Sequence, residues 1–327
     1  MAACIVIVVA GMKMSRSLLV PILLSAFIAF LCTPPISRLK TWGLPSWAAV
    51  TVVVLILVIA LLSLTGIVGT SVREYTSRIP DYDLSLDEIR DRAIAWVTER
   101  SIPVEEEKVR EIFDSEQLLS LISSTLMELL GALSNMVVIL MITIFMLIEA
   151  EGLPRKLRRI GGGPDADISG YTQVATAVND FLRVKTGMSL LTGAAVTAFL
   201  FIIGIDYPFL WGVVAFLFNY VPQIGSIIAA IPAVLLALIT RDLTTAIIVA
   251  GCYLGMNSLI GNVLEPRLMG KTLGLSVFVT VISLIFWNWV LGPVGMLLSI
   301  PLTMVVKILL EHSDDMRSAA ILLGPPE

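Results

Sequence analysis

Glu265, in the segment NVLEPRLMG, stands at the end of a long apolar run. A charged group within a membrane span is costly to bury, so such residues mark ion or substrate paths by default. On an α-helix, Ser258, Asn262 and Glu265 fall at i, i+4 and i+7 and share one face, with Asn257 beside them. This polar stripe could line a pathway, hydrogen-bond to a neighbouring helix, or end the helix at the cytoplasmic surface.

A second polar group interrupts the apolar run of residues 208–241, in the segment FNYVPQIG. Pro222 removes a backbone donor, and Gly225 supplies flexibility beside it. Hydrocarbon cannot hydrogen-bond a broken backbone, so such a break persists where protein or a water-filled cavity surrounds it, and transporters place broken helices at substrate sites. Asn219 and Gln223 flank the break, where they either bond the freed backbone groups or face a polar ligand.

Three basic residues lie close to these segments. Arg183 and Lys185 precede the apolar run 187–204, and Arg267 follows Glu265. We interpret them as anchors at the inner membrane face or as gating residues. The chain has no nucleotide-binding Walker sequence and no metal-spaced His or Cys residues, so we expect no enzymatic activity, catalytic residue, metal or cofactor, and no nucleic-acid partner. Solute flow would be passive or coupled to an ion gradient.

Composition sets the class of protein. Of the 327 residues, 57% are hydrophobic and 15% are charged, and the mean hydropathy is +0.93. Soluble domains carry about 25% charged residues and lack apolar runs of about 20 residues. We therefore expect an all-α, polytopic helical membrane protein in the lipid bilayer of the plasma membrane. The apolar runs are 18–33, 46–70, 130–148, 187–204, 209–239, 244–264 and 274–310.

The distribution of charge predicts sidedness. Between Asp81 and Glu116 there are twelve acidic and five basic residues, whereas 155–159 holds four basic residues. Because Lys and Arg near span ends mark the cytoplasmic side, we place 155–159 in the cytoplasm and 73–118 outside.

The pattern also predicts an order of segments. Pro34-Pro35 should end the second of two N-terminal helices, 1–12 and 17–33, and an interfacial helix should cover 165–184. The segment 73–118 is interpreted as a small helical insertion, with a solvated linker as the alternative. The predicted order is N-terminal transmembrane helices 1–72, extracytoplasmic insertion 73–118, transmembrane helix 119–150, cytoplasmic linker and interfacial helix 151–185, transmembrane transport core 186–311 with a hairpin at 208–241, and cytoplasmic tail 312–327.

The length of the broken run leaves two arrangements open. One helix over 209–239 would be about 46 Å long, well beyond a hydrocarbon core of about 30 Å. Its two pieces, 209–221 and 226–240, would be about 20 and 22 Å, each short for a span. The run is either one kinked span or a re-entrant hairpin. The hairpin is favoured because it keeps the later basic residues cytoplasmic. These are Arg267, Lys271, Lys307 and Arg317.

Four segments together resemble the autoinducer-2 exporter family: VKTGMSLLTG (184–193), WGVVAFLFNYVPQIGSIIAAIPAVLLAL (211–238), GNVLEPRLMGKTLGLS (261–276) and FWNWVLGPVGMLLSIPLTMVVKILLE (286–311). The resemblance implies an integral membrane transporter with about eight helical segments that forms a homo-oligomer, a pentamer being one form. Members have been associated with export of the furanone signal autoinducer-2, and others resemble sodium or lithium/proton antiporters. The family motif residues present are Asn219, Pro222, Gly225, Glu265, Pro266, Leu268, Met269 and Gly270.

Three hypotheses of function follow. The leading one is a secondary transporter that exports a small hydrophilic solute similar to autoinducer-2. The second is a sodium or lithium/proton antiporter. Such a protein requires a buried carboxylate pair, whereas this chain offers Glu265 with Glu128, Glu149 and Glu151 near span ends, which favours the organic solute. The third is a non-transporting membrane assembly protein whose 73–118 segment binds a partner.

Overall fold

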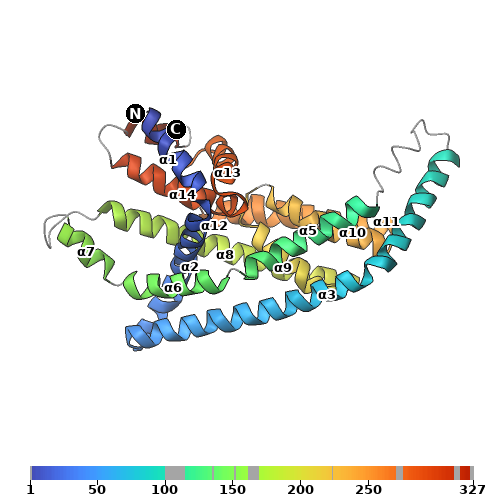
Figure 1. Cartoon of the computed structure of the whole chain (residues 1–327), viewed down its shortest axis with the longest axis horizontal. Coiled ribbons are helices and arrows are strands. Elements are labelled where there is room, and N and C mark those ends of the chain that lie inside the picture. The colour runs from blue at the N-terminus through green and yellow to red at the C-terminus, as the bar shows by residue number, and fades with distance from the viewer. Residues whose placement is uncertain are drawn as a thin grey trace. The chain divides into compact units, whose positions relative to one another are not determined.

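The structure is a computed structural model, and within the residues that it describes every regular element is a helix (Figure 1). The all-α class is therefore confirmed. The chain divides into two compact units. The first unit comprises 1–60, 135–188 and 263–327, and the second comprises 61–134 and 189–262. The described ranges are 2–99, 115–134, 136–150, 152–160, 169–222, 224–269, 275–312 and 317–324.

Several helices are long and apolar enough to cross a membrane, so the polytopic class is also confirmed. Five qualify individually, and a sixth span results if the bent pair Met136–Ala150 (α6) and Leu153–Ile160 (α7) is counted as one. The five are Arg16–Thr41 (α2), Ser46–Ile79 within α3, Ser169–Ile203 (α8), Leu243–Leu264, and Pro293–Glu311 (α14).

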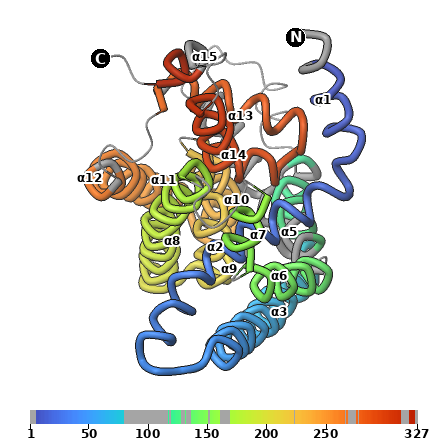
Figure 2. The backbone as a smooth tube through the Cα atoms, turned by 90° about the vertical axis from the view of Figure 1, so that its left-hand side faces the viewer, coloured from blue at the N-terminus to red at the C-terminus, as the bar shows by residue number. Residues whose placement is uncertain are grey.

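The first unit contains a hairpin of Val277–Leu291 (α13) and α14, which pack side by side (Figure 2). The chain reverses at Gly292, whose φ of 73° is accessible to glycine, and Pro293 opens α14 at its first turn. Trp287 of α13 donates a buried 3.0 Å hydrogen bond to Thr303 of α14. The predicted division of 274–310 at Gly292-Pro293 is therefore confirmed. The helix Ala2–Met14 (α1) packs against both α13 and α2.

The prediction that Pro34-Pro35 ends a helix is wrong, because α2 continues through both prolines to Thr41. Each proline removes one backbone donor, which in an α-helix would bond the carbonyl four residues earlier. Thr33 Oγ1 donates to Ala29 O at 3.0 Å, and Ser37 Oγ donates to Thr33 O at 2.9 Å. These carbonyls are not the ones that the prolines leave without a donor, so the two bonds do not explain why the helix continues.

Three helix boundaries also differ from the sequence-based expectation. The helix Ser46–Glu99 (α3) is continuous, so the span is not separated at residue 73 from the helical segment that follows, and 100–114 lie outside the described residues. The stretch 119–150 falls on two described helices, Ser115–Ser134 (α5) and α6, and residue 135 between them lies outside the described residues. The expected interfacial helix 165–184 coincides from Ser169 onwards with the first part of α8, and 165–168 lie outside the described residues.

The second unit is built around the buried Trp211 of the helix Pro208–Phe218 (α9). Its indole Nε1 donates to Asp206 O at 3.2 Å, so the one polar atom of this ring is bonded. Buried residues of α3, α5 and α8 belong to the same apolar cluster, as do residues of Gly225–Thr240 (α10) and Leu243–Met256 (α11). This apolar unit holds the interrupted run singled out in the sequence.

Candidate functional site

The interrupted run forms two packed helices, α9 and α10, joined by residues 219–224. They have 11 and 16 residues, or about 17 and 24 Å of helix, so neither reaches across a hydrocarbon core of about 30 Å. The predicted break is confirmed. Whether both ends lie on one membrane side stays a prediction, because no membrane is present.

The described residues of the connection between α9 and α10 form local backbone hydrogen bonds. Val221 N donates to Phe218 O at 2.9 Å, Ile224 N to Pro222 O at 2.7 Å, and Gly225 N to Val221 O at 3.2 Å. Local bonds of this kind help an irregular backbone to exist away from water. The Asn219 side chain bonds outside the connection, where its Nδ2 donates to Ser189 Oγ of α8 at 3.0 Å.

Gly225 is needed at the start of α10 for steric reasons. A Cβ at this position would overlap the Phe218 carbonyl oxygen and would lie 3.1 Å from Val221 Cβ. A second close approach lies between α8 and α9, where a Cβ on Gly193 would lie 2.7 Å from Gly212 O. Both contacts involve backbone, which cannot move aside as a flexible side chain can. The glycines therefore set how closely the hairpin packs on itself and on α8.

A small cavity lies beside the break, within the second unit. Its volume is about 10 Å³, room for a single water molecule. Among the described residues, its lining has no Asp, Glu, Lys, Arg or His. Five lining residues have side chains that are capable of hydrogen bonding: Thr192, Asn219, Ser226, Tyr253 and Asn257.

Two hydroxyl groups of this lining have unused hydrogen-bonding capacity. Ser226 Oγ and Tyr253 OH are buried and have no hydrogen-bond partner within the described part of the chain. Burying a hydroxyl without a partner is unfavourable by about 1–3 kcal/mol in proteins, so such groups require an explanation. A bound molecule with its own hydroxyl or carbonyl groups would satisfy both. The cavity thus has the chemistry of a neutral polar binding site.

The first unit contains a buried ion pair instead. Lys185 Nζ of α8 donates to Glu265 Oε1 at 2.6 Å, and the two side chains are 3% and 15% exposed. The predicted anchoring or gating role of Lys185 stays a prediction, and its ammonium group is directed to a carboxylate within the fold. Opposite charges this deeply buried compensate each other, and removal of either leaves the other uncompensated.

The segment between α11 and Glu265 is a π-helix, Asn257–Leu264 (η1), and not the α-helix assumed from the sequence. Its i→i+5 hydrogen bonds widen each turn, so positions at i, i+4 and i+7 no longer share a face. Ser258 and Asn262 are exposed, while Asn257 lines the cavity. The predicted polar stripe is therefore not one surface in this fold. Single π-turns occur frequently at functional sites.

The remaining predicted residues are spread over the fold. Arg183 is exposed and lies 3.9 Å from Asp180 on its own helix, and Arg267 is exposed on Glu265–Met269 (α12). Gln223 lies outside the described residues.

Sequence reasoning missed Ser189, Thr192, Ser226 and Tyr253 as candidates. A signal for two of them was present: Lys185, Ser189 and Thr192 fall at i, i+4 and i+7 of α8, and all three are buried. A polar stripe at helical spacing in an apolar run indicates a face that is directed towards protein or a cavity.

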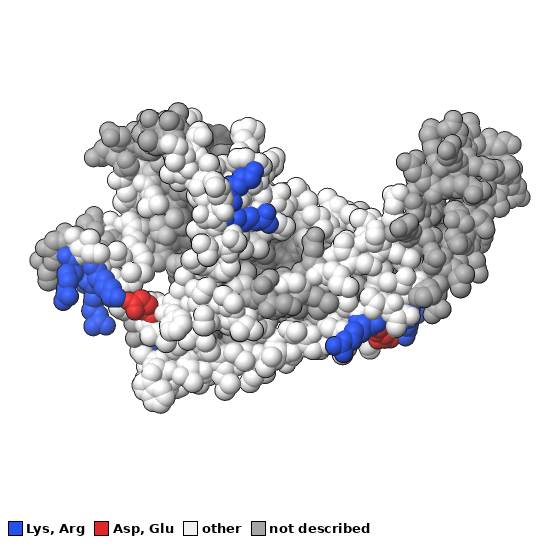
Figure 3. All heavy atoms as spheres, in the orientation of Figure 1, with Lys and Arg blue, Asp and Glu red and all other residues white. Residues whose placement is uncertain are grey.

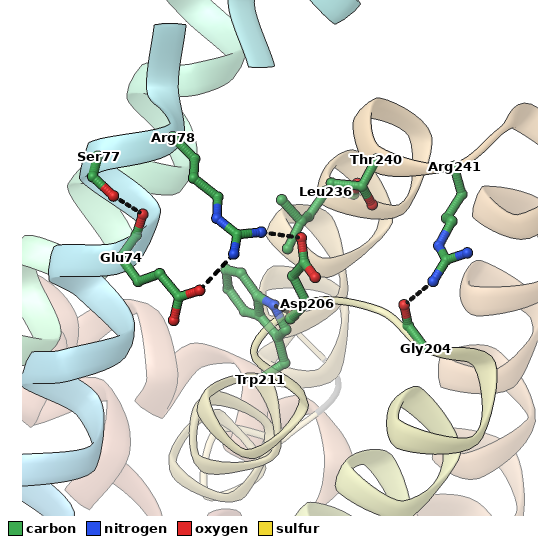
Figure 4. A network of polar contacts seen from close by, with 9 residues as sticks. All are labelled: Glu74, Ser77, Arg78, Gly204, Asp206, Trp211, Leu236, Thr240 and Arg241. Atoms are coloured by element: carbon green, nitrogen blue, oxygen red, sulfur yellow. Dashed lines mark hydrogen bonds and ion pairs between the residues drawn. The ribbon is translucent and has the colours of Figure 1, made fainter. Parts of the chain in front are cut away.

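A polar network holds the loop 204–207 between α8 and α9 (Figure 4). Arg241, at the end of α10, donates from Nη2 to Gly204 O at 2.6 Å. Arg78 of α3 lies 2.7 Å from Glu74 and 3.6 Å from Asp206. The start of α9 and the end of α10 are thus both connected to one short loop.

These features define an all-helical, multi-pass membrane protein with a broken helix pair, and broken helices are typical of transporters. The family comparison agrees. The model of the AI-2E family transporter matches residues 3–315, and the chain belongs to this family. It is therefore a membrane transporter.

Two relatives show how far the likeness extends. AI-2 transport protein TqsA of Escherichia coli K12 is 35% identical over 324 residues, covering 99% of this chain and 94% of that protein. A protein of Haemophilus influenzae is 36% identical over 331 residues, covering 99% of this chain and 95% of that protein. Its name assigns it a transport role only provisionally.

Proposed function

We propose that this transporter exports a small, neutral, hydrophilic solute across the plasma membrane, and that the cavity beside the α9–α10 break contacts it. The observation that carries the proposal is the pair of hydroxyls without a partner among the described residues, Ser226 Oγ and Tyr253 OH, in an uncharged and mostly apolar cavity. A hydroxylated furanone of the autoinducer-2 type has the complementary donors and acceptors. The name of the TqsA relative points to the same class of solute.

The size of the cavity implies movement. About 10 Å³ admits no solute larger than water, so the described arrangement is a closed state. Opening requires a displacement of α10 or α11 from α8 and α9 within the second unit. The connection 219–224 is suited to this because it is short, irregular and bonded to itself. In this proposal Asn219, Pro222, Gln223 and Gly225 shape the movable segment.

The polar residues after α11 complete the proposed pathway set. Asn257 contributes to the cavity lining. Ser258 and Asn262 are exposed on η1 and are proposed to contact solute in an open state. Glu265, held by Lys185, is proposed to respond to the charge or ion that drives transport. Arg183 and Arg267 stay assigned as membrane-face anchors, with sodium, lithium or protons as candidate coupling ions.

The test is flux of a small hydroxylated furanone from proteoliposomes that contain the wild-type protein or single variants. We expect Tyr253→Phe and Ser226→Ala each to lower the rate about tenfold, the effect of losing roughly 1.4 kcal/mol of solute contact. Glu265→Gln should also lower flux while the protein still inserts. Gly251→Ala is the matched control, because nothing lies within 4 Å of its added Cβ. Flux that is unchanged in both hydroxyl variants would remove the cavity from the pathway.

A second candidate function is cation/proton antiport, and the buried Lys185–Glu265 pair favours it. A carboxylate held by an ammonium group could exchange that partner for sodium, lithium or a proton. The same vesicles discriminate the two functions: an imposed pH gradient that collapses on addition of sodium or lithium, and no longer does so in Glu265→Gln, supports antiport. A gradient that is insensitive to both cations leaves the organic solute as the proposal.

We also propose that the chain assembles as a homo-oligomer, with a pentamer as the form to test, and that 155–159 faces the cytoplasm while 73–118 lies outside. Native mass spectrometry of the detergent-solubilised protein measures the stoichiometry. Labelling of single cysteines at the exposed positions 77 and 158 in intact cells measures sidedness. A monomeric mass, or labelling of position 158 from outside, would contradict these assignments.

A further inference from the structure

The helix α7, LPRKLRRI, concentrates positive charge at one place in the first unit. Four of its eight residues are basic, and all four are exposed (Figure 3, over α7 in the orientation of Figure 1). These residues are Arg155, Lys156, Arg158 and Arg159. Positive charge of this density attracts anionic surfaces over distances up to a Debye length, about 8–10 Å in physiological salt.

Part of this charge is not neutralised within the described structure. Lys156 pairs with Glu149 at the end of α6, which fastens α7 to the preceding helix. Arg155, Arg158 and Arg159 have no ion-pair partner among the described residues. Three guanidinium groups, each with planar donors suited to phosphate, are therefore presented together.

The opposite side of α7 is apolar. Leu153, Leu157 and Ile160 fall at i, i+4 and i+7 and so share one face, and Ile160 is 83% exposed. A short helix with an apolar face and a strongly basic face is typical of helices that lie in the membrane interface. A partner that satisfies both faces must offer hydrocarbon and negative charge side by side.

The orientation of α7 fits this environment. α6 is apolar, and α7 is bent by 62° relative to it. Transmembrane helices tilt by about 20° on average from the bilayer normal, so a bend of this size brings α7 towards the plane of the membrane surface. The apolar face can then enter the acyl boundary while the arginines remain at the level of the headgroups.

We propose that α7 is a membrane-surface helix whose Arg155, Arg158 and Arg159 bind the phosphate groups of anionic phospholipids. The bilayer is the occupant favoured over a soluble acidic partner, because α7 has an apolar face of its own and directly follows the apolar helix α6. This inference is independent of which solute the protein carries.

The experiment places a nitroxide spin label at Ile160→Cys, after Cys4, Cys32 and Cys252 are replaced by alanine. The full-length protein is reconstituted in nanodiscs of phosphatidylcholine alone or with one third phosphatidylglycerol. Collision of the label with oxygen, which concentrates in lipid, is compared with collision with a water-soluble nickel complex. We expect phosphatidylglycerol to shift the label to the oxygen-accessible, nickel-protected state. The triple variant R155Q/R158Q/R159Q should lower the docked-to-undocked ratio by roughly fivefold per arginine.

Two controls keep the result decisive. The variant R155K/R158K/R159K retains the charge and should retain docking, which separates loss of lipid binding from misfolding. Inorganic phosphate added to phosphatidylcholine discs should not protect the label, because a free anion offers no acyl boundary. Equal accessibility in both lipids, protection by free phosphate or an acidic peptide alone, or docking retained in the glutamine variant would each overturn the proposal.

Discussion

The two units of this protein bury polar groups in opposite ways. In the first unit, Lys185 and Glu265 neutralise each other at 2.6 Å, and each charge has its partner. In the second, the cavity beside the α9–α10 break is uncharged and leaves Ser226 Oγ and Tyr253 OH without partners among the described residues. The two charges of the ion pair compensate each other, whereas the two cavity hydroxyls have no hydrogen-bond partner among the described residues. A compensated pair stabilises one conformation, and hydroxyls without a partner are suited to bind a solute.

The largest expected effect comes from breaking the ion pair on one side. Lys185→Met leaves the Glu265 carboxylate buried without its ammonium partner, which should lower the free energy of unfolding by about 3–5 kcal/mol. Thermal unfolding of the purified protein measures this change. The double variant K185M/E265M should recover most of the loss, because no charge is then left alone. Losses that simply add in the double variant would show that the pair is not coupled.

The next effect concerns the close packing between α9 and α10 at Gly225. Gly225→Ala pushes a methyl group against the Phe218 carbonyl and Val221 Cβ, which should destabilise the second unit by about 1–3 kcal/mol. Gly251→Ala adds the same methyl group where nothing lies within 4 Å. This control should be neutral or gain up to about 1 kcal/mol from helix propensity. Equal melting temperatures for the two variants would contradict the close packing at the break.

The hydroxyls of the cavity are expected to contribute to transport but not to the stability of the fold. Tyr253→Phe and Ser226→Ala remove buried hydroxyls that have no partner among the described residues, so each should leave the free energy of unfolding unchanged or raise it by up to about 1–3 kcal/mol. Asn219→Ala loses its bond to Ser189 and should cost about 1 kcal/mol. If the hydroxyl variants lose as much stability as Asn219→Ala, their hydroxyls are bonded and the contrast with the ion pair disappears.

A smaller effect is expected from the network around the loop 204–207. Arg78 is 45% exposed, so Arg78→Gln should reduce stability by about 1 kcal/mol at most. The difference from wild type should shrink in about 0.5 M salt, because exposed pairs are screened. A loss that is independent of salt would show that Arg78 acts through packing. This measurement allows the stabilisation by an exposed ion pair to be compared with that by the buried Lys185–Glu265 pair.

The smallest effect is a dependence on pH at the start of α11. The Thr245 backbone N–H, followed by further contacts with Thr245, lowers the pKa of the Asp242 carboxyl below its ordinary value. A lowered folded-state pKa means that the stabilisation is present above the unfolded pKa and is lost as pH falls through the folded one. The difference in melting temperature between wild type and Asp242→Asn should therefore begin to shrink near the unfolded pKa of about 4 and vanish only at lower pH, below the folded-state pKa. A difference that persists there would contradict the role of the charge.

The membrane class and the break could be predicted from the sequence, because hydropathy and a proline–glycine interruption are local signals. The Lys185–Glu265 pair could not be, because its partners are 80 residues apart and local spacing does not encode a tertiary contact. The face assigned to Ser258 and Asn262 differs because the expectation assumed α-helical geometry where the chain forms π-turns. Pro34 and Pro35 were predicted to end a helix, whereas α2 continues through both of them to Thr41.

The π-helix η1 has a consequence for changes in chain length. In an α-helix, deletion of one residue turns everything beyond it by about 100° and shifts it by 1.5 Å. A segment already wound with i→i+5 bonds can absorb that deletion by returning to i→i+4 bonds, with its flanks kept in place. The eight residues Asn257–Leu264 are thus the part of this apolar region where the chain can lose one residue and keep the neighbouring helices in register.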